Sequence, residues 1–249
     1  MLSKANIKDI QSLQQKKYRQ TAGLFIAEGP KVVHELLSEG TFMVEAIYAT
    51  ATWSGWNMLD QYSIDSNKCI EVPDFILEKI AFYSTPNQVV ALFRIPQQTE
   101  SPDTNSIFLV LDHIQDPGNL GTIIRTADWF GISQIICSSD TTDVYAPKVV
   151  QSTMASLGRV QLHYLDLHPW LLSQKGKLPI YTTHMKGAHP SKVLSGKKEG
   201  MIIIGNESHG VNPLWHDLAD ETIAIPQFGS AESLNAAVAA SILMYAIRQ

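Results

Sequence analysis

Three stretches in the C-terminal half of the chain decide the fold. They are LDHIQDPGNLGTIIRTADWFG at residues 111–131, IIIGNESHG at 202–210 and IPQFGSAESLNAAVAA at 225–240. Each is an apolar run, then a tight polar turn, then a helical pattern. In open α/β sheets, ligands bind at the C-terminal ends of the strands. These stretches therefore predict an α/β domain with a polar site along one edge of its sheet.

Further apolar runs extend this pattern over the rest of the C-terminal half. They begin near Ile107, Gln134, Pro179, Met201 and Thr222, with a weaker candidate near Val160, and helical segments separate most of them. Strands and helices that alternate at this spacing indicate a mostly parallel sheet covered on both faces. The pattern alone predicts an open, unknotted, Rossmann-like sheet, because knots are very rare in proteins.

The N-terminal half predicts a second, smaller α/β domain. Residues 96–106 are polar and carry two prolines, so we expect a linker between a domain at 1–95 and a domain at 107–249. Within the smaller domain we expect helices at 7–19, 30–37 and 74–81, the last capped by Asp74, and strands at 44–49 and 88–95.

Composition excludes several classes of protein. At 45% apolar and 17% charged residues, the chain is typical of a globular protein. No apolar run approaches the roughly 20 residues that span a bilayer, and the first residues do not look like a signal peptide. Cys69 and Cys137 are too few for a disulfide framework or a zinc site, so we expect packing residues in a cytoplasmic protein.

The charge is uneven along the chain. The net charge is −5, yet residues 1–31 carry a local charge of +4 from Lys4, Lys8, Lys16, Lys17, Arg19 and Lys31 against Asp9 and Glu28. A basic end on an acidic body is one form of a phosphate-contacting footprint. A solvated helix face would explain the same cluster equally well.

Local physical chemistry gives the three polar turns ordinary roles as well. Asn119 and Ser233 stand where helix N-caps belong, and Gly131 stands where a helix ends. Gly205 allows a ligand or another backbone to come close. Arg125 has apolar neighbours, so we expect it to be partly buried and paired with an acid, for which Glu207 is the natural candidate.

Taken together and in this order, the three stretches resemble the SpoU (TrmH-like) family of RNA ribose 2′-O-methyltransferases. The resemblance covers residues 107–249, and a weaker one to that family's RNA-binding domain covers 1–95. It rests there on Lys16 and Lys17, on residues 25–29 and on 84–91, although a glycine common near Val89 is absent. The resemblance implies a trefoil-knotted (SPOUT-type) parallel-sheet domain and a small N-terminal α/β domain like that of ribosomal protein L30.

The resemblance also implies site residues, a cofactor and partners. Arg125 matches the arginine regarded as catalytic, and the other polar motif residues are Asn119, Glu207, Ser233 and Asn235. The cofactor, S-adenosylmethionine, would be held by Thr183, Gly205, Asn206, Ile225, Gln227 and Leu234. Gln227 and Ala236 depart from the more frequent methionine and valine. The implied partners are RNA, with rRNA favoured over tRNA, and a second copy of the chain bound through the apolar helix 233–248. No metal and no membrane are expected.

Other functions remain open at this point. An RNA base methyltransferase of the same knotted fold is the nearest enzymatic alternative, and a non-catalytic RNA-binding scaffold is an alternative of another class. Retention of all five polar motif residues weighs against a scaffold. An NAD-dependent enzyme is disfavoured, because no G-x-G-x-x-G pattern follows any expected strand. The sequence does not choose between Arg125 as a base and Arg125 as a clamp for phosphate and hydroxyl.

Overall fold

The computed structural model describes residues 2–83, 87–97, 101–206 and 208–249. These residues form two compact units. The first contains residues up to Gln97 together with Asp143–Arg159, and the second contains Gln98–Thr142 together with Val160–Gln249. The segment Asp143–Arg159 therefore folds with the N-terminal part, although in sequence it lies between two strands of the larger sheet.

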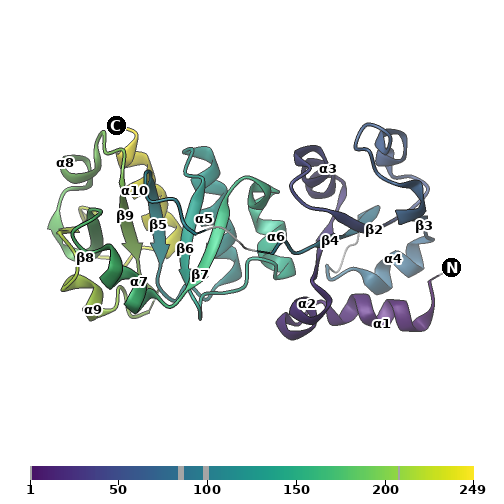
Figure 1. Ribbon diagram of the computed structural model, residues 1–249, viewed down its shortest axis with the longest axis horizontal. Helices are drawn as coiled ribbons and strands as arrows, with labels where there is room; N and C mark the ends of the chain where they lie inside the picture. The colour runs from purple at the N-terminus through teal and green to yellow at the C-terminus, as the bar shows by residue number, and fades with distance from the viewer. Residues whose placement is uncertain (1, 84–86, 98–100, 207) are drawn as a thin grey trace. The chain divides into compact units, whose positions relative to one another are not determined.

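The N-terminal unit is a four-stranded sheet with helices on both faces (Figure 1). The strand order is β1-β4-β2-β3; β4 pairs antiparallel with β1 and β2, and β2 pairs parallel with β3. The elements of this unit are α1 (Lys4–Ser12), α2 (Lys16–Ala22), β1 (Leu24–Glu28), α3 (Pro30–Glu39), β2 (Val44–Ala49), η1 (Ser54–Met58), η2 (Ser66–Lys68), β3 (Cys69–Glu71), α4 (Asp74–Ile80), β4 (Val89–Arg94), α6 (Pro147–Thr153) and η3 (Ser156–Gly158).

Side chains on the two faces of the smaller sheet pack into two separate cores. Ile26, Val90 and Leu92 join a buried cluster that also contains side chains of α1 and α4. Their strand neighbours point to the other face, since successive side chains of a strand alternate. There the ring of Phe25 stacks on Phe93 and also meets Tyr145, from the segment that precedes α6.

Two expectations for the N-terminal unit are wrong in detail. The helix expected over 7–19 is two helices, α1 and α2, because the chain turns after Ser12 and starts a new helix at Lys16. Asp74 is the first residue of α4 rather than its cap, and Pro73 holds the cap position. The strand expected at 44–49 is confirmed by β2, and the helix expected at 30–37 is confirmed by α3, which continues to Glu39.

Arg19 is buried in an ion pair, which removes it from the basic footprint expected at the N-terminus. The side chain is 2% exposed, and its Nε and Nη2 atoms contact Asp143 Oδ2 at 3.0 and 2.5 Å. Its Nη1 atom donates to the carbonyl oxygens of Leu13 and Gln14 at 2.7 and 2.8 Å. One guanidinium therefore fixes the turn between α1 and α2 and holds the start of the segment Asp143–Arg159.

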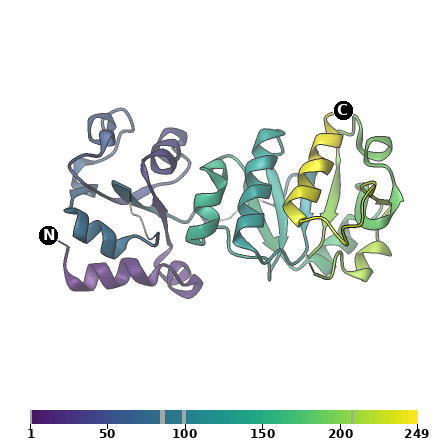
Figure 2. The same cartoon turned by 180° about the vertical axis from the view of Figure 1, so that it is seen from behind.

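The second unit is a six-stranded, fully parallel sheet of order β10-β8-β9-β5-β6-β7. Helices α5 and α10 lie side by side on one face, and α7 and α9 lie on the other (Figures 1 and 2). The elements are β5 (Ile107–Leu111), α5 (Pro117–Trp129), β6 (Gln134–Ser138), β7 (Gln161–Leu165), α7 (Leu167–Gln174), β8 (Ile180–Ala188), α8 (Pro190–Leu194), β9 (Gly200–Ile204), α9 (Pro213–His216), β10 (Glu221–Ile223) and α10 (Ala236–Ile247).

The predicted parallel sheet is confirmed, and a strand forms near each of the expected starts. The central strands β5 and β9 are buried at every position, as their continuous apolar sequences require. Strand β8 is longer than expected, since it continues past Thr183 to Ala188 along β10. The knot implied by the family resemblance stays a prediction.

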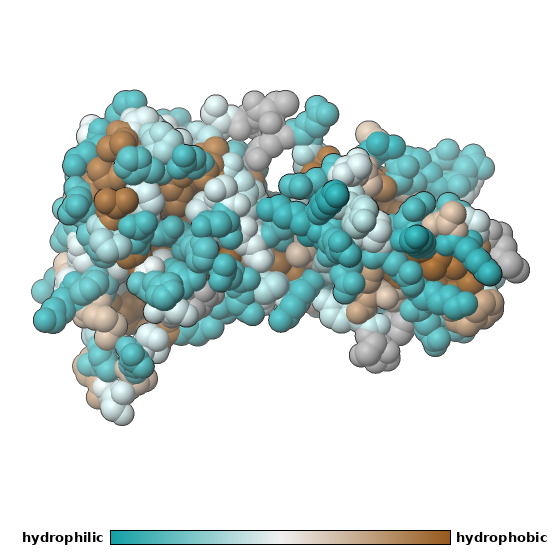
Figure 3. Space-filling view, turned by 90° about the horizontal axis from the view of Figure 1, so that it is seen from below, coloured by the Kyte–Doolittle hydropathy of each residue, from teal (hydrophilic) through white to brown (hydrophobic). Residues whose placement is uncertain are grey.

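The surface and the helices of the described residues give no sign of a membrane span. On the face shown in Figure 3, hydrophilic residues predominate and hydrophobic ones form separate patches. Among the residues described, no helix combines the length and the apolar character that crossing a bilayer requires.

Replacing Arg19 should test how strongly its ion pair stabilises the N-terminal unit. Asp143 is 15% exposed, so Arg19→Met would leave a largely buried carboxylate without its cation while keeping much of the apolar stem. We expect the free energy of unfolding to fall by about 3–5 kcal/mol, measured by urea denaturation. The control is Arg159→Met, which removes an ion pair with Glu39 that is 34% exposed on each side and should cost about 0–1 kcal/mol. Equal effects of the two variants would contradict this role for Arg19.

Candidate active site at the carboxyl edge of the parallel sheet

The strand order places two of the three polar stretches next to each other. From β5 the chain first adds β6 and β7 on one side, and it later adds β8, β9 and β10 on the other. Strands β5 and β9 therefore flank the point where the order reverses, which is where open α/β sheets bind ligands. The two strands end in register, with Leu111 opposite Ile204, and Asp112 N donates to Ile204 O at 2.9 Å.

Helix α5 begins differently from the sequence expectation. Asp116 is its N-cap and accepts from the backbone N–H of Asn119 at 2.8 Å, with Pro117 in the first turn. Asn119 therefore lies inside the first turn, where its side chain is not needed for capping. The expected end is confirmed: Gly131 has φ +65°, and the N–H groups of Gly131 and Ile132 donate to Asp128 O and Ala127 O at 3.0 and 2.8 Å.

Helix α10 is capped by Asn235 and not by Ser233, which is exposed. The Asn235 Oδ1 atom accepts from the N–H groups of Ala237 and Val238 at 2.9 and 3.3 Å. Its Nδ2 atom donates to Asn119 Oδ1 at 2.9 Å. A single amide therefore starts α10 and joins the first polar stretch to the third. The structure thus brings together two of the expected site residues, Asn119 and Asn235.

Arg125 lies on the exposed side of α5, so the expectation that it is partly buried is wrong. Its apolar neighbours Ile123 and Ile124 are fully buried, because they lie on the opposite side of the helix. Glu207, the expected partner, lies outside the described residues. An exposed guanidinium can offer its planar fork to a ligand, and such a fork suits a phosphate or a carboxylate.

Gly205 lies where one backbone presses against another. A Cβ atom at this position would be 2.1 Å from the carbonyl carbon of Gly210, because the loop folds back over the end of β9. Asn206 and Gly210 exchange backbone hydrogen bonds of 3.0 and 2.9 Å, which closes the loop. Of the two explanations open for Gly205, the close approach of another backbone is therefore the one observed.

The side chain of Asn206 connects the second polar stretch to the first. Its Oδ1 atom accepts from the N–H groups of Ser208 and His209 at 2.8 and 3.2 Å, and its Nδ2 atom donates to His113 O at 2.9 Å. His113 is in the left-handed region at φ +62°, a conformation that non-glycine residues adopt rarely. The ties from Asn206 hold the two neighbouring loops in one arrangement.

Sequence reasoning missed two bracing acids at this edge. Asp112 follows β5 directly, and its Oδ2 atom accepts from Trp215 Nε1 at 2.7 Å and from Asn212 N at 3.2 Å. Asp140 pairs with His113 Nδ1 at 2.5 Å. Partial burial acts to raise the pKa of Asp140, but hydrogen bonds from Ser138 and His113 outweigh it and lower that pKa. An acid directly after a buried strand was the available signal for Asp112; no comparable signal marks Asp140.

The remaining residues of the expected cofactor site lie within β8 and in the segment after β10. Thr183 is half-buried, and its hydroxyl donates to Ile203 O at 3.1 Å. Ile225 is half-buried, Leu234 is exposed, and the Gln227 side chain bonds within its own loop. Because β10, β8 and β9 are neighbours, their C-terminal ends meet at one edge. No group of three potential metal-ligating side chains occurs among the residues described.

Comparison with known proteins identifies the family. The SpoU rRNA methylase family matches residues 106–245 by sequence, and an MRM3-like substrate binding domain matches residues 4–91. The chain belongs to the SpoU rRNA methylase family. The match covers all three polar stretches, so the bonded pair Asn119–Asn235 and the exposed Arg125 belong to the methylase part of the chain.

Full-length relatives of this SpoU methylase are known by sequence and by structure. It is 30% identical to the 23S rRNA (guanosine(2553)-2′-O)-methyltransferase RlmP of Bacillus subtilis, over 97% of this chain and 95% of that one. An AdoMet-bound rRNA methyltransferase from Sinorhizobium meliloti superposes with a TM-score of 0.86 at 29% identity, covering 99% and 96% of the two chains. The SpoU methyltransferase AviRb from Streptomyces viridochromogenes, in complex with AdoMet, gives 0.85 at 25%, covering 98% and 97%.

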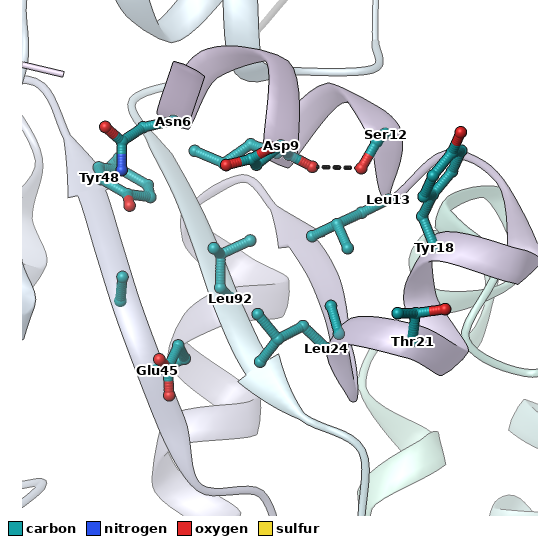
Figure 4. Close-up of a pocket in the computed structure, with 13 residues that line it drawn as sticks. Asn6, Asp9, Ser12, Leu13, Tyr18, Thr21, Leu24, Glu45, Tyr48 and Leu92 are labelled. Carbon is teal, nitrogen blue, oxygen red and sulfur yellow. Dashed lines mark hydrogen bonds between the residues drawn. The ribbon is translucent and has the colours of Figure 1, made fainter. Parts of the chain in front are cut away.

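The N-terminal unit of this SpoU methylase has a pocket of its own. It measures about 380 Å³ and lies between α1, α2 and the sheet, with Leu13 on the helical side and Leu24 and Leu92 on the strands (Figure 4). The carboxyl groups of Asp9 and Glu45 belong to its lining, and Glu45 also pairs with Arg94 at 2.6 Å. The two carboxylates disfavour a phosphate at this pocket, which has none of the residues that the sequence predicted for the site.

An added methyl group should lower the free energy of unfolding at one glycine of the sheet edge and leave it nearly unchanged at another. Gly205→Ala puts a Cβ atom into the backbone of Gly210, so we expect the free energy of unfolding to fall by about 1–3 kcal/mol in urea denaturation. Gly229→Ala is the control, because a Cβ atom at Gly229 meets nothing within 4 Å and its φ is not positive. If Gly205→Ala is as stable as Gly229→Ala, the close packing of the two backbones is not required.

Proposed function

We propose that the protein transfers a methyl group from S-adenosylmethionine to a ribose 2′-hydroxyl of RNA, with rRNA as the favoured substrate. The observation that carries the proposal is the hydrogen bond from Asn235 to Asn119, which joins two family motifs where the strand order reverses. Two further facts support it. The Bacillus subtilis relative is named a 2′-O-methyltransferase of 23S rRNA, and two structural neighbours contain AdoMet.

The segments after β9 and β10, together with Thr183 of β8, fit a nucleoside with an apolar surface and polar ends. Leu234 and Ile225 offer apolar side chains that their own chain does not fully cover. The side chains of Asn206 and Gln227 already bond within their loops. In our proposal these residues, with Gly205, therefore contribute backbone groups. Thr183 completes the cofactor set. When bound, the cofactor supplies a methyl group already activated by its sulfonium, so no metal is required.

The chain's own task is to position a weak nucleophile. A sugar hydroxyl is a very weak acid, and arginine stays protonated in proteins. Arg125 therefore serves as a clamp that binds an RNA phosphate and polarises the hydroxyl, while the proton leaves through water. Asn119 and Asn235 orient the reacting groups, and Ser233 and Glu207 complete the proposed catalytic set. Alignment of this kind can remove several kcal/mol from a barrier.

The N-terminal unit selects and holds RNA in this proposal, which the match to a substrate binding domain supports. Lys4, Lys8, Lys16 and Lys17 are all exposed on α1 and α2 and can contact phosphates, whereas Arg19 is buried. Two relatives, from Bacillus subtilis and Streptomyces viridochromogenes, are named methyltransferases of 23S rRNA, which favours rRNA over tRNA.

Mapping of ribose methylation across total RNA, with and without this protein, tests the function. We expect one or a few ribose sites, first of all in rRNA, to lose methylation when the protein is absent. Loss of a base methylation instead would favour a base methyltransferase of the same fold. No change in any RNA methylation, although RNA is bound, would favour a non-catalytic scaffold.

Arg125→Ala should nearly abolish methyl transfer while cofactor affinity stays close to that of the wild type. Arg125→Lys separates the two mechanisms, because lysine keeps the charge but loses the planar fork, and it releases a proton more readily. We expect Lys to stay poor at every pH, as a clamp requires, in single-turnover assays with bound RNA. Recovery of activity as pH rises would favour a base instead, and near-normal transfer by Arg125→Ala would remove Arg125 from the site.

We also propose a homodimer formed through α10. The side chains of Val238, Ile242 and Tyr245 are exposed at helical spacing on this otherwise buried helix. The ring of Tyr245 meets Phe130, whose neighbour Trp129 is also exposed, so α5 extends the same apolar surface. A surface of this kind on a small domain favours association with a second copy.

Ile242→Glu should convert the dimer to a monomer at micromolar concentration, because it would bury a charge in the interface. Light scattering of the full chain measures the mass directly. Leu172→Glu, an exposed apolar residue of α7, is the matched control and should leave the mass unchanged. A wild-type monomer under these conditions would contradict the proposed interface.

A further inference from the structure

A long, fully exposed segment borders the proposed site. Every residue from Pro226 to Asn235 is exposed, although the segment contains Phe228 and Leu234. Phe228 is 99% exposed, more than any other large hydrophobic side chain among the residues described. An aromatic ring of this size normally packs against the protein, because its exposure to water is unfavourable. A ring this exposed suggests a binding partner that covers it during function.

The turn that carries Phe228 is braced rather than loose. The Nε2 atom of Gln227 donates to Gly229 O at 3.0 Å and to Ala231 O at 2.8 Å. Phe228 lies in the sequence between Gln227, which donates both bonds, and the two residues that accept them. The brace fixes the backbone on both sides of the ring, so that the ring projects from the turn in a restricted set of directions. Gln227, which departs from the family's frequent methionine, provides this brace through its amide.

The segment starts and ends at the proposed site. It follows β10 at the carboxyl edge of the sheet and ends at Asn235, which binds Asn119 in the first turn of α5. Arg125 lies on the same helix, on its exposed side. Phe228 therefore lies on an exposed segment whose two ends are part of the proposed site.

We infer that Phe228 is a positioning residue that stacks on an unpaired base of the RNA substrate. This inference rests on the proposed function and adds how the RNA is held beside the ribose that reacts. Single-stranded RNA is commonly recognised through bases that stack on aromatic side chains. A base is favoured over a phosphate, because the ring carries no charge and the nearby Glu232 is acidic. A second copy of the chain is the alternative partner for the ring, and a weaker dimer of the Phe228 variants in light scattering would reveal it.

The test compares Phe228→Ala, Phe228→Leu and Phe228→Trp in single-turnover methylation of rRNA extracted from cells that lack the protein. Stacking is worth about 1–3 kcal/mol per base, so the half-saturating RNA concentration should rise by about 5- to 150-fold with Ala. The rate at saturating RNA should change by less than about twofold, because stacking holds the RNA before and during reaction alike. Trp should restore the wild-type value, and Leu should not, since only an aromatic ring offers a π face.

Leu172→Ala serves as the control for loss of exposed apolar surface, because Leu172 is an exposed side chain on α7 and belongs to no proposed site. It should methylate as the wild type does. Rescue of Phe228→Ala by Leu, a weaker dimer in light scattering, or reduced affinity for S-adenosylmethionine would each overturn the stacking role. If the wild type methylates rRNA and Phe228→Ala does so equally, this inference fails alone. If the wild type does not methylate ribose at all, the proposed function fails and takes the inference with it.

Discussion

The hydrogen bonds of one amide, that of Asn235, organise the proposed active site. This side chain caps α10 through its oxygen and binds Asn119 through its nitrogen, so the start of the last helix and the start of α5 share one reference point. Both helices lie on the same face of the sheet, where they pack against each other (Figure 2). Any residue carried on either helix, Arg125 included, takes its position partly from this contact.

In the neighbouring loops, too, single side chains make several hydrogen bonds each. Asn206 orders its own turn and ties it to the backbone of His113, while Asp112 anchors the start of α9 through Trp215 and Asn212. Short polar side chains thus hold loops that have little apolar surface to bury. Asn206 and Asn235 therefore have a structural role in these loops, in addition to the role in binding or catalysis that we propose for them. A substitution at Asn206 would remove the bonds that hold this loop in shape.

The strands were predictable because continuous apolar runs of four or five residues have few alternatives in an α/β protein. The order of the strands was not predictable, since it depends on contacts between distant segments. The predicted helix N-caps were wrong for a related reason. Asn119 and Ser233 are good cap residues by type, but Asp116 and Asn235 are also good caps, and tertiary contacts decided between them. Arg125 was expected inside because its neighbours are apolar, yet a helix separates adjacent residues by about 100° and turned it outward. For Arg19 the prediction was wrong in the other direction. It was expected to be an exposed cation, but it is buried, because it pairs with an acid that lies 124 positions away in the sequence.

The placement of Asp143–Arg159 has a consequence for the modularity of this protein. The segment lies in sequence between β6 and β7 but folds with the N-terminal unit, where Arg19 and Phe25 meet Asp143 and Tyr145. Neither unit is thus a continuous piece of chain, and the polypeptide passes between them at three places. Cutting the chain between residues 96 and 106 would separate Asp143 from Arg19 and Tyr145 from Phe25. In evolutionary terms, the segment Asp143–Arg159 and the part of the chain up to Gln97 are expected to change together, because both supply side chains to the same unit.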